Sequence, residues 1–293
     1  IFFSISEITL TSLTLIPQLS FNQFDRNETF KSWVLPESIS SPMIKMAAFT
    51  FLFFLFILIK MNFESKLISG KFLKRYKRFF VDIKIKETVI TAHCPNTGSM
   101  MGLLKEGNKV WVSKSQNPTR KLKYTLEIIE VKKNKVGINT HSTNKIFLKA
   151  LRDKKLKVFS NFHLIKTEEK YNKSTRFDFL LEDNKKKIFI EIKNVTLLRK
   201  RGIGEFPDSI TTRGSKHIKE LVNASRDGYG AYLIFIIQRE DCKSFRIARD
   251  IDVDYYNTLK KAIKNKLKVL CYDCKFSSKG ISINKSIDFK LDD

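Results

Sequence analysis

The chain has 293 residues, and its 55 lysines and arginines against 30 aspartates and glutamates give a formal net charge of +25. This length allows two domains or one large one, and the natural partner of so basic a chain is a polyanion, nucleic acid first of all. Four scattered cysteines exclude a disulfide scaffold and fit a reducing cytoplasm, where we expect the protein. AT-rich coding would also produce the abundance of Lys, Ile, Asn and Phe.

Residues 1–60 differ from the rest, because their basic and acidic side chains balance and the excess charge lies in 61–293. Within them, Ala47–Ile59 is an apolar run, shorter than the roughly 17–25 residues of a transmembrane helix and without a small-residue cleavage site after it. The run is a short membrane anchor, an uncleaved signal-like segment, or upstream sequence translated from a wrong start, with Met61 the true one. We favour the last interpretation and treat 1–60 as an extension outside any domain. A membrane partner is expected only if the run is a genuine anchor.

Residues 61–143 predict a small β-barrel. Short segments with strand-like patterning follow one another, separated by turns. These segments are Phe79–Ile85, Thr88–His93, Lys109–Ser113, Tyr124–Val131 and Lys135–Ile138. For about five strands in about 70 residues, a barrel of the oligonucleotide-binding (OB) type is the economical arrangement.

Two loops of this domain can contact an anion. The turn Asn96–Gly98 can supply positive φ and amides that cradle an anion, although a plain turn is the simpler interpretation. The loop with Arg120, Lys121 and Lys123 can follow a phosphate backbone. The alternative for this loop is a solvated run of charge.

Residues 144–293 mix helices with strands, which predicts an α/β domain of the mixed α+β kind. The predicted helices are Asn144–Lys157, capped by Asn144 or Thr143, a second one from Ser209 or Asp208 to Asp227, and Tyr255–Lys266. The predicted strands outside the central hairpin are Tyr229–Ile237, which is apolar enough to be fully buried, and Lys268–Phe276. The connecting segments are an extended or irregular lead-in, Val158–Tyr171, and a basic loop, Val195–Asp208.

The hairpin Thr175–Asn194 carries the predicted active site. Asp178, Glu191 and Lys193 stand within apolar strands, and the last two share a face. If the strands pair about their turn, the carboxylates meet and can hold a divalent cation, Mg²⁺ or Mn²⁺. The cation would activate a water, and the lysine would orient it or stabilise negative charge. The spacing looks like the PD-(D/E)xK nuclease signature, and the alternative is a salt-bridged hairpin facing solvent.

Other motifs carry less chemistry. Cys271 and Cys274 lack a second pair of zinc ligands, so we interpret them as packing residues. His217 lies in a polar helical cluster, where it can reach a phosphate or make a structural hydrogen bond. Asp208 either borders the metal site or caps the helix. No P-loop, GxGxxG or GxSxG motif occurs, so we expect no nucleotide cofactor.

Seven longer motifs follow one another between about residues 63 and 285: Ala92–Leu104, Asn117–Glu127, Gly137–Thr140, Thr175–Asp183, Ile190–Leu197, Phe206–Leu221 and Phe235–Arg239. With them the chain resembles the sugar fermentation stimulation protein (SfsA) family. The resemblance implies an N-terminal OB-fold joined to a PD-(D/E)xK nuclease-like domain, a DNA-binding protein, and a link to sugar (maltose) metabolism. It places the family's metal-site pattern on Asp178, Glu191 and Lys193, with Glu168 at an acidic position upstream.

We therefore expect a protein that grips DNA with little sequence preference and has a metal-dependent, nuclease-like site. The expected DNA contacts are Arg120, Lys121, Lys123, Arg176, Arg213 and Lys216. One alternative is a DNA-binding regulator of sugar (maltose) metabolism without catalysis. The other is a membrane-tethered protein anchored by Ala47–Ile59.

Overall fold

The computed structural model describes residues 63 and 65–291, so the extension 1–60 with its apolar run lies outside the described residues. By its contacts the chain divides into units 1–60 and 61–293, and the fold below belongs to the second. Within the described part of the chain, no helix is long and apolar enough to span a membrane.

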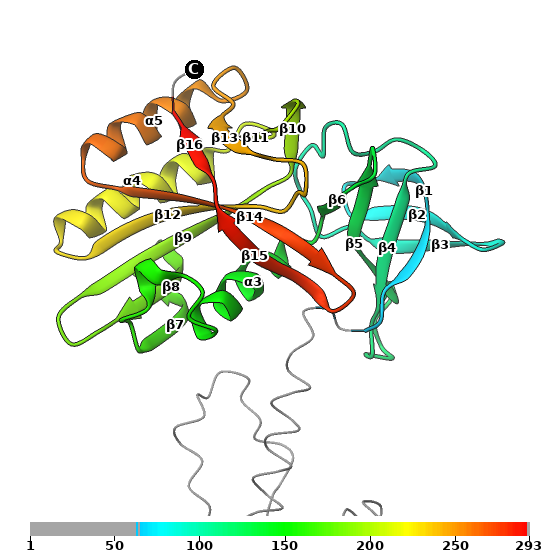
Figure 1. Cartoon of the computed structure of the whole chain (residues 1–293), viewed down its shortest axis with the longest axis horizontal. Helices are drawn as coiled ribbons and strands as arrows, with labels where there is room; N and C mark the ends of the chain where they lie inside the picture. Colours follow the sequence, from blue (N-terminus) through cyan, green and yellow to red (C-terminus); the bar gives the residue numbers. More distant parts are fainter. Residues whose placement is uncertain (1–62, 64, 292–293) are drawn as a thin grey trace, which may run out of the picture. The chain divides into compact units, whose positions relative to one another are not determined.

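The N-terminal part of the described chain, residues 68–137, is a closed barrel (Figure 1). Its strands are β1 (Ile68–Tyr76), β2 (Phe80–Ile85), β3 (Thr88–His93), β4 (Lys109–Lys114), β5 (Tyr124–Val131) and β6 (Asn134–Gly137). They pair in the order β3-β2-β1-β4-β5-β6, and a further β3–β5 pairing closes the first five into a barrel. The OB-like prediction is confirmed.

Strand β1 was not predicted. Its side chains alternate between exposed or half-buried positions, and only Phe72 is fully buried. The interleaved Lys71, Lys74 and Arg75 hide its period, and pairing with β2 and β4 decides its conformation.

The rest of the described chain, from residue 141 on, is an α/β domain around a six-stranded sheet of order β15-β14-β12-β9-β8-β7. Its strands are β7 (Leu164–Lys170), β8 (Arg176–Glu182), β9 (Lys187–Val195), β12 (Gly230–Ile237), β14 (Lys268–Ser277) and β15 (Gly280–Ser286). The middle three, β9, β12 and β14, run parallel, and the outer strands are antiparallel to their neighbours. The helices α4 (Thr212–Arg226) and α5 (Val253–Lys264) cover one face, and α3 (His141–Arg152) packs on the other (Figure 1).

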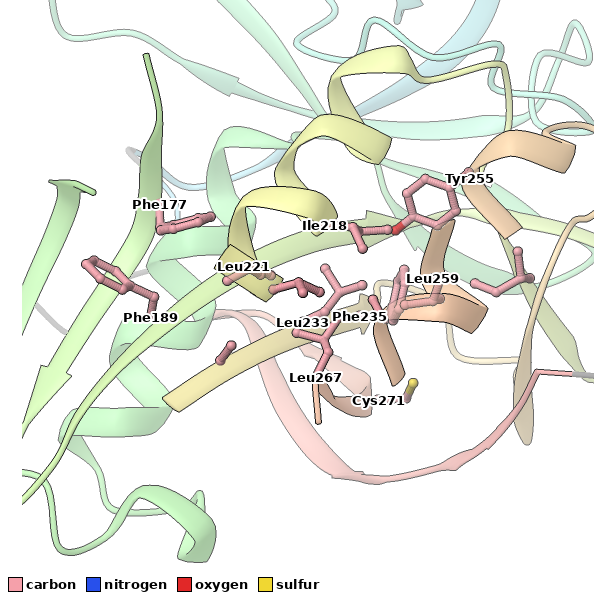
Figure 2. Close-up of a cluster of buried hydrophobic side chains, with 14 of the residues drawn as sticks. Phe177, Phe189, Ile218, Leu221, Leu233, Phe235, Tyr255, Leu259, Leu267 and Cys271 are labelled. Carbon is pink, nitrogen blue, oxygen red and sulfur yellow. The ribbon is translucent and has the colours of Figure 1, made fainter. Parts of the chain in front are cut away.

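Strand β12 is buried on both faces, as its apolar sequence predicts. Leu233 and Phe235 pack against α4 and α5, as Figure 2 shows, whereas Ile234 and Ile236 belong to the core on the α3 side. Cys271 and Cys274 likewise lie in the two different cores and are free thiols. These positions agree with their interpretation as packing residues.

A second, four-stranded sheet replaces the predicted basic loop Val195–Asp208. It consists of β10 (Leu197–Lys200), β11 (Ile203–Phe206), β13 (Ser244–Ile247) and β16 (Asp288–Lys290). Buried Glu205 accepts hydrogen bonds from Arg199 Nε at 2.9 Å and Arg246 Nε at 3.0 Å. Arg199 therefore forms an ion pair within this sheet. The prediction of a basic loop at Val195–Asp208 was wrong.

Two helix starts also differ from the prediction. Helix α3 begins at His141 after the N-cap residue Thr140, so neither Thr143 nor Asn144 caps it; a short 3₁₀ helix, η3 (Lys157–Phe159), follows. Helix α4 is capped by Thr211, whose hydroxyl accepts from the Gly214 amide at 3.0 Å. Asp208 and Ser209 precede that cap. The segment Val158–Tyr171, predicted to be extended or irregular, contains β7, so the extended alternative describes it.

Candidate functional site

Asp178 and Glu191 lie side by side on the adjacent strands β8 and β9. The strands pair antiparallel with Phe179 opposite Ile190, so one further step along the ladder brings Asp178 next to Glu191. The Ile192 amide donates to Asp178 Oδ2 at 2.7 Å. The hairpin thus brings the two predicted carboxylates together.

Asp178 is a carboxyl group whose charge is unfavourable in its surroundings. Burial and the neighbouring Glu191 carboxylate raise the pKa of Asp178 to about 6. Hydrogen bonds from the Ile192 amide and from Asn144 Nδ2, the latter at 2.8 Å, favour the charged form and limit this rise. Asp178 therefore exchanges its proton much closer to neutral pH than an exposed aspartate does.

Glu191 has the opposite balance. It is 4% exposed, and its Oε1 lies 2.6 Å from both Lys193 Nζ and His217 Nδ1. Burial raises the pKa of Glu191, but Lys193 and His217 outweigh this effect and the net shift is downward. Two adjacent carboxyl groups therefore differ in protonation over a range of acidic pH, which is an arrangement found at acid–base sites.

His217 links Glu191 to Arg213. Arg213 Nε donates to His217 Nε2 at 3.4 Å, so the ring proton sits on Nδ1 and is donated to Glu191. The ring also makes an edge contact with Phe177. Of the two roles that the sequence leaves open for His217, the structure shows a hydrogen bond, and its acceptor is a predicted site residue.

Asn144 is a site residue that sequence reasoning missed. It was predicted as a helix cap, but it lies inside α3 and its amide donates to Asp178 Oδ1. No local pattern identifies this contact, because it depends on how α3 packs against the sheet.

The donor set of Asp178 and Glu191 fits a hard divalent cation. Two carboxylates held together and largely desolvated repel each other, as the raised pKa of Asp178 indicates, and a cation that prefers oxygen ligands would offset this repulsion. Among residues 63 and 65–291, no three His, Cys, Asp or Glu side chains gather into a metal-binding cluster. Water or substrate oxygens would complete the coordination.

Glu168 does not join the pair. On either side of Glu168, strand β7 keeps the same register with β8: Thr167 is opposite Phe179 and Glu169 is opposite Phe177. Glu168 therefore lies across from Asp178. Its backbone is left-handed, with φ of 53°, and its side chain is exposed to solvent. The structure therefore does not support the prediction of Glu168 as a third metal ligand.

Three of the predicted DNA contacts surround the carboxylates. Arg176, Arg213 and Lys216 are all exposed. Arg176 precedes Asp178 by two residues on β8, and Arg213 contacts His217. Lys216 Nζ lies 3.4 Å from the Ser174 carbonyl, at the start of the hairpin. Positive charge thus lies next to the acidic pair.

The other three lie on the barrel, in the loop before β5. Lys121 and Lys123 are exposed. Arg120 Nη2 donates to Thr125 Oγ1 at 2.8 Å, so this contact orients part of its guanidinium group.

The two residues after the turn Asn96–Gly98, Ser99 and Met100, bind Asp208 of the same chain, while the Gly98 amide donates to Asn96 Oδ1. The Met100 amide donates to Asp208 Oδ2 at 3.2 Å, and Ser99 Oγ donates to the Asp208 carbonyl at 2.8 Å. A Cβ atom on Gly98 would lie 2.3 Å from Asp208 Oδ2. Asp208, predicted to cap α4 or to border the metal site, instead ties the barrel to the segment before α4.

A hollow of about 770 Å³ lies elsewhere, at the start of β9 and β12. Five lysines contribute to its wall: Lys185, Lys186, Lys187, Lys266 and Lys268. Its lining includes neither Asp178 nor Glu191, so this hollow is not the candidate metal site.

Two family models match the chain. The model described as the sugar fermentation stimulation protein RE domain matches residues 141–280, and the SfsA N-terminal OB domain matches residues 73–138. Among similar proteins, the sugar fermentation stimulation protein homolog of Pelagibacter ubique is 56% identical over 227 residues, covering 78% of this chain and 98% of the relative. The homolog of Maricaulis maris is 40% identical over 233 residues, with coverages of 79% and 99%.

A solved structure is similar as well. The SfsA of Pyrococcus furiosus in complex with Ca²⁺ is 26% identical and superposes with a TM-score of 0.72, covering 78% of this chain and 99% of that one. Fold, motifs and relatives agree, and the chain belongs to the SfsA family.

Proposed function

We propose that this protein binds DNA and hydrolyses its phosphodiester bonds with a divalent cation held by Asp178 and Glu191. One observation carries the proposal: two carboxylates with opposite pKa shifts and a lysine meet at one point of the β8–β9 hairpin. The Ca²⁺ complex of the Pyrococcus furiosus relative supports the metal part of the proposal.

Each residue has a distinct role in this proposal. Asp178 and Glu191 would hold the cation, which would supply a water of lowered pKa and offset phosphate charge. Lys193 and His217 both contact Oε1 of Glu191, so they would fix the position of this carboxylate as a ligand. Asn144 and the Ile192 amide fix Asp178 by one hydrogen bond to each of its two oxygens. The Lys193 ammonium then orients the attacking water or stabilises negative charge.

The DNA grip rests on exposed positive charge. Arg176, Arg213 and Lys216 border the carboxylates, and Arg120, Lys121 and Lys123 extend the basic surface onto the barrel. Such side chains neutralise phosphates without reading bases, so the protein would bind with little sequence preference and lose affinity steeply as salt rises.

The second candidate is a regulator of sugar fermentation that binds DNA without cutting it. The names of the relatives, sugar fermentation stimulation protein homologs, favour it. It uses the same basic surfaces and needs no turnover at Asp178 and Glu191.

A cleavage assay tests the proposal and separates the two candidates. The purified full chain is incubated with labelled single-stranded and duplex DNA in Mg²⁺, Mn²⁺ or EDTA, beside the variant Glu191→Gln. We expect metal-dependent cleavage by the wild type and its loss in the variant. Glu182→Gln is the matched control, because Glu182 lies on the same hairpin but pairs with Lys187 at 3.1 Å.

Two results would overturn the nuclease proposal. Salt-sensitive binding without cleavage under either metal would support the regulator. Equal cleavage by wild type and Glu191→Gln would move the catalytic site away from the hairpin.

A further inference from the structure

Three aromatic rings form a row across the outside of the barrel. Tyr76 on β1 is opposite Phe80 on β2, and Phe80 is opposite His93 on β3. Residues opposite each other on paired strands point to the same face. The neighbouring pair Val81 and Ala92 is fully buried, so the row of rings lies on the outer face.

The rings are already arranged in a way that suits stacking. Tyr76 and Phe80 are nearly parallel, at 16°, with centroids 5.6 Å apart. Phe79, at the turn between β1 and β2, lies nearly parallel to His93 at 18° and 6.3 Å. Phe79 is 42% exposed and Tyr76 37% exposed, so both rings offer apolar surface to solvent.

Basic side chains border this row. Lys77 and Arg78 form the turn between β1 and β2 and are exposed, and Lys74 Nζ lies 5.6 Å from the Tyr76 ring centroid. The one acidic residue on this part of the face, Asp82, is bound by Tyr76, Thr91 and Lys74. Exposed rings with positive charge around them are the recognition surface of proteins that bind single-stranded nucleic acid.

The row leads to the hairpin carboxylates. Pro95, just after His93, accepts hydrogen bonds at its carbonyl from the Thr140 amide at 3.2 Å and from Thr140 Oγ1 at 2.7 Å. Helix α3 begins with the next residue, His141, and Asn144, one turn further on, holds Asp178. Burial lowers the pKa of His93, and the nearby Arg120 and His141 lower it further. The hydrogen bonds between Thr140 and Pro95 place the end of the row next to the start of α3.

We propose that the aromatic platform, defined as Tyr76, Phe79, Phe80 and His93, binds the unpaired bases of a single-stranded nucleic acid and directs that strand along α3 to Asp178. Binding by the platform stands on its own geometry, whereas delivery to Asp178 rests on the proposed nuclease function. Unpaired bases expose their faces to aromatic rings, but the bases of a duplex are stacked on each other. The platform therefore predicts a preference for single strands that positive charge alone does not give.

The test measures binding in EDTA, where no cleavage is expected. Fluorescence anisotropy compares a labelled single-stranded DNA, its duplex, the same sequence in RNA, and an abasic strand with an equal number of phosphates. In the variant Phe79→Ala we expect about 5- to 150-fold weaker binding to the single strand, the range for one stacked base. Affinity for the abasic strand should be unchanged, and so should the slope of log affinity against log salt, because no charge is removed.

Val89→Ala is the matched control, since Val89 is an apolar residue of the same barrel that is 56% exposed but lies outside the platform. Phe79→Trp should bind like the wild type, because it keeps an aromatic ring at this position. Unchanged affinity of Phe79→Ala for the abasic strand excludes misfolding as the cause of its loss of binding. Equal affinities of Phe79→Ala and Val89→Ala for the single strand would overturn the proposal, as would equal losses on the abasic strand. Because the assay contains no active metal, a failure of the nuclease proposal leaves this result interpretable.

Discussion

Replacing Asp178 with asparagine should change how the stability of this protein depends on pH. The pKa of Asp178 is about 6 in the folded chain, against a reference value of 3.8. Because the folded pKa is raised, the unfolded chain loses this proton first as pH increases. The stability contribution is therefore fully present below pH 3.8 and is lost as pH rises through 6.

The size of the effect follows from the shift. The difference of 6 − 3.8 = 2.2 pKa units, at about 1.36 kcal/mol per unit, corresponds to about 3 kcal/mol. Protonated Asp178 and asparagine are both neutral and similar in shape, so the two proteins should have similar stability near pH 4. Near pH 7, Asp178→Asn should be more stable by about 3 kcal/mol, a large part of the roughly 5–15 kcal/mol typical of a folded domain.

Denaturant unfolding followed by circular dichroism between pH 4 and 7, in EDTA, measures this difference. Asp183→Asn is the control with the opposite sign, because the amide of Lys185 lowers the pKa of Asp183. This hydrogen bond stabilises the ionised carboxylate in the folded chain, so replacing Asp183 should cost stability at neutral pH. A difference between wild type and Asp178→Asn that stays constant from pH 4 to 7 would refute the electrostatic description of the site.

Three further substitutions test other parts of the account. Gly98→Ala should destabilise the chain by about 1–3 kcal/mol, because its Cβ would lie 2.3 Å from Asp208 Oδ2; adding Asp208→Ala should recover part of this loss in thermal melts, and simple additivity would contradict the contact. Tyr255→Phe should stabilise by about 1–3 kcal/mol, because it removes a buried hydroxyl that has no hydrogen-bond partner within residues 63 and 65–291; a destabilised variant in the same melts would show that the hydroxyl is satisfied. Neutralising Arg120, Lys121 and Lys123 of the barrel loop together should weaken DNA binding. It should also lower the slope of log affinity against log salt by about one unit per lost phosphate contact, and an unchanged slope would show that DNA binds to another surface.

The sequence predicts this fold best where one period dominates. The uninterrupted apolar run of β12 identifies a strand buried on both faces, and the alternation around Asp178 and Glu191 predicts that the two carboxylates meet. Strand β1 cannot be predicted from its sequence, because pairing with β2 and β4, rather than its own pattern, determines its conformation. Strands β10 and β11 were not predicted, because the charge of Arg199 suggests an exposed loop unless its ion pair with Glu205 is known.

The same distinction applies to the site. Asp178, Glu191 and Lys193 stand within one hairpin, so their proximity follows from local pairing. The contacts of Asn144 and His217 with these carboxylates join residues 34 and 26 positions apart in the chain, and only tertiary packing creates them. Glu168 is a position where the sequence suggests more than the structure supports. Its place in the sequence and in the strand register suggests a metal ligand, but its backbone is left-handed and its side chain is exposed.

The most direct test of the central claim is the single-turnover rate of DNA cleavage by wild type and Lys193→Met in Mg²⁺. Lys193 contacts Glu191 without being a proposed cation ligand, so the variant should still bind metal and DNA, as calorimetry and anisotropy can verify. We expect cleavage by Lys193→Met to be slower by about 100-fold or more, the range for removing a group that acts on the proton or charge of the reaction. Cleavage by Lys193→Met at the wild-type rate would contradict the assignment of this hairpin as a nuclease site.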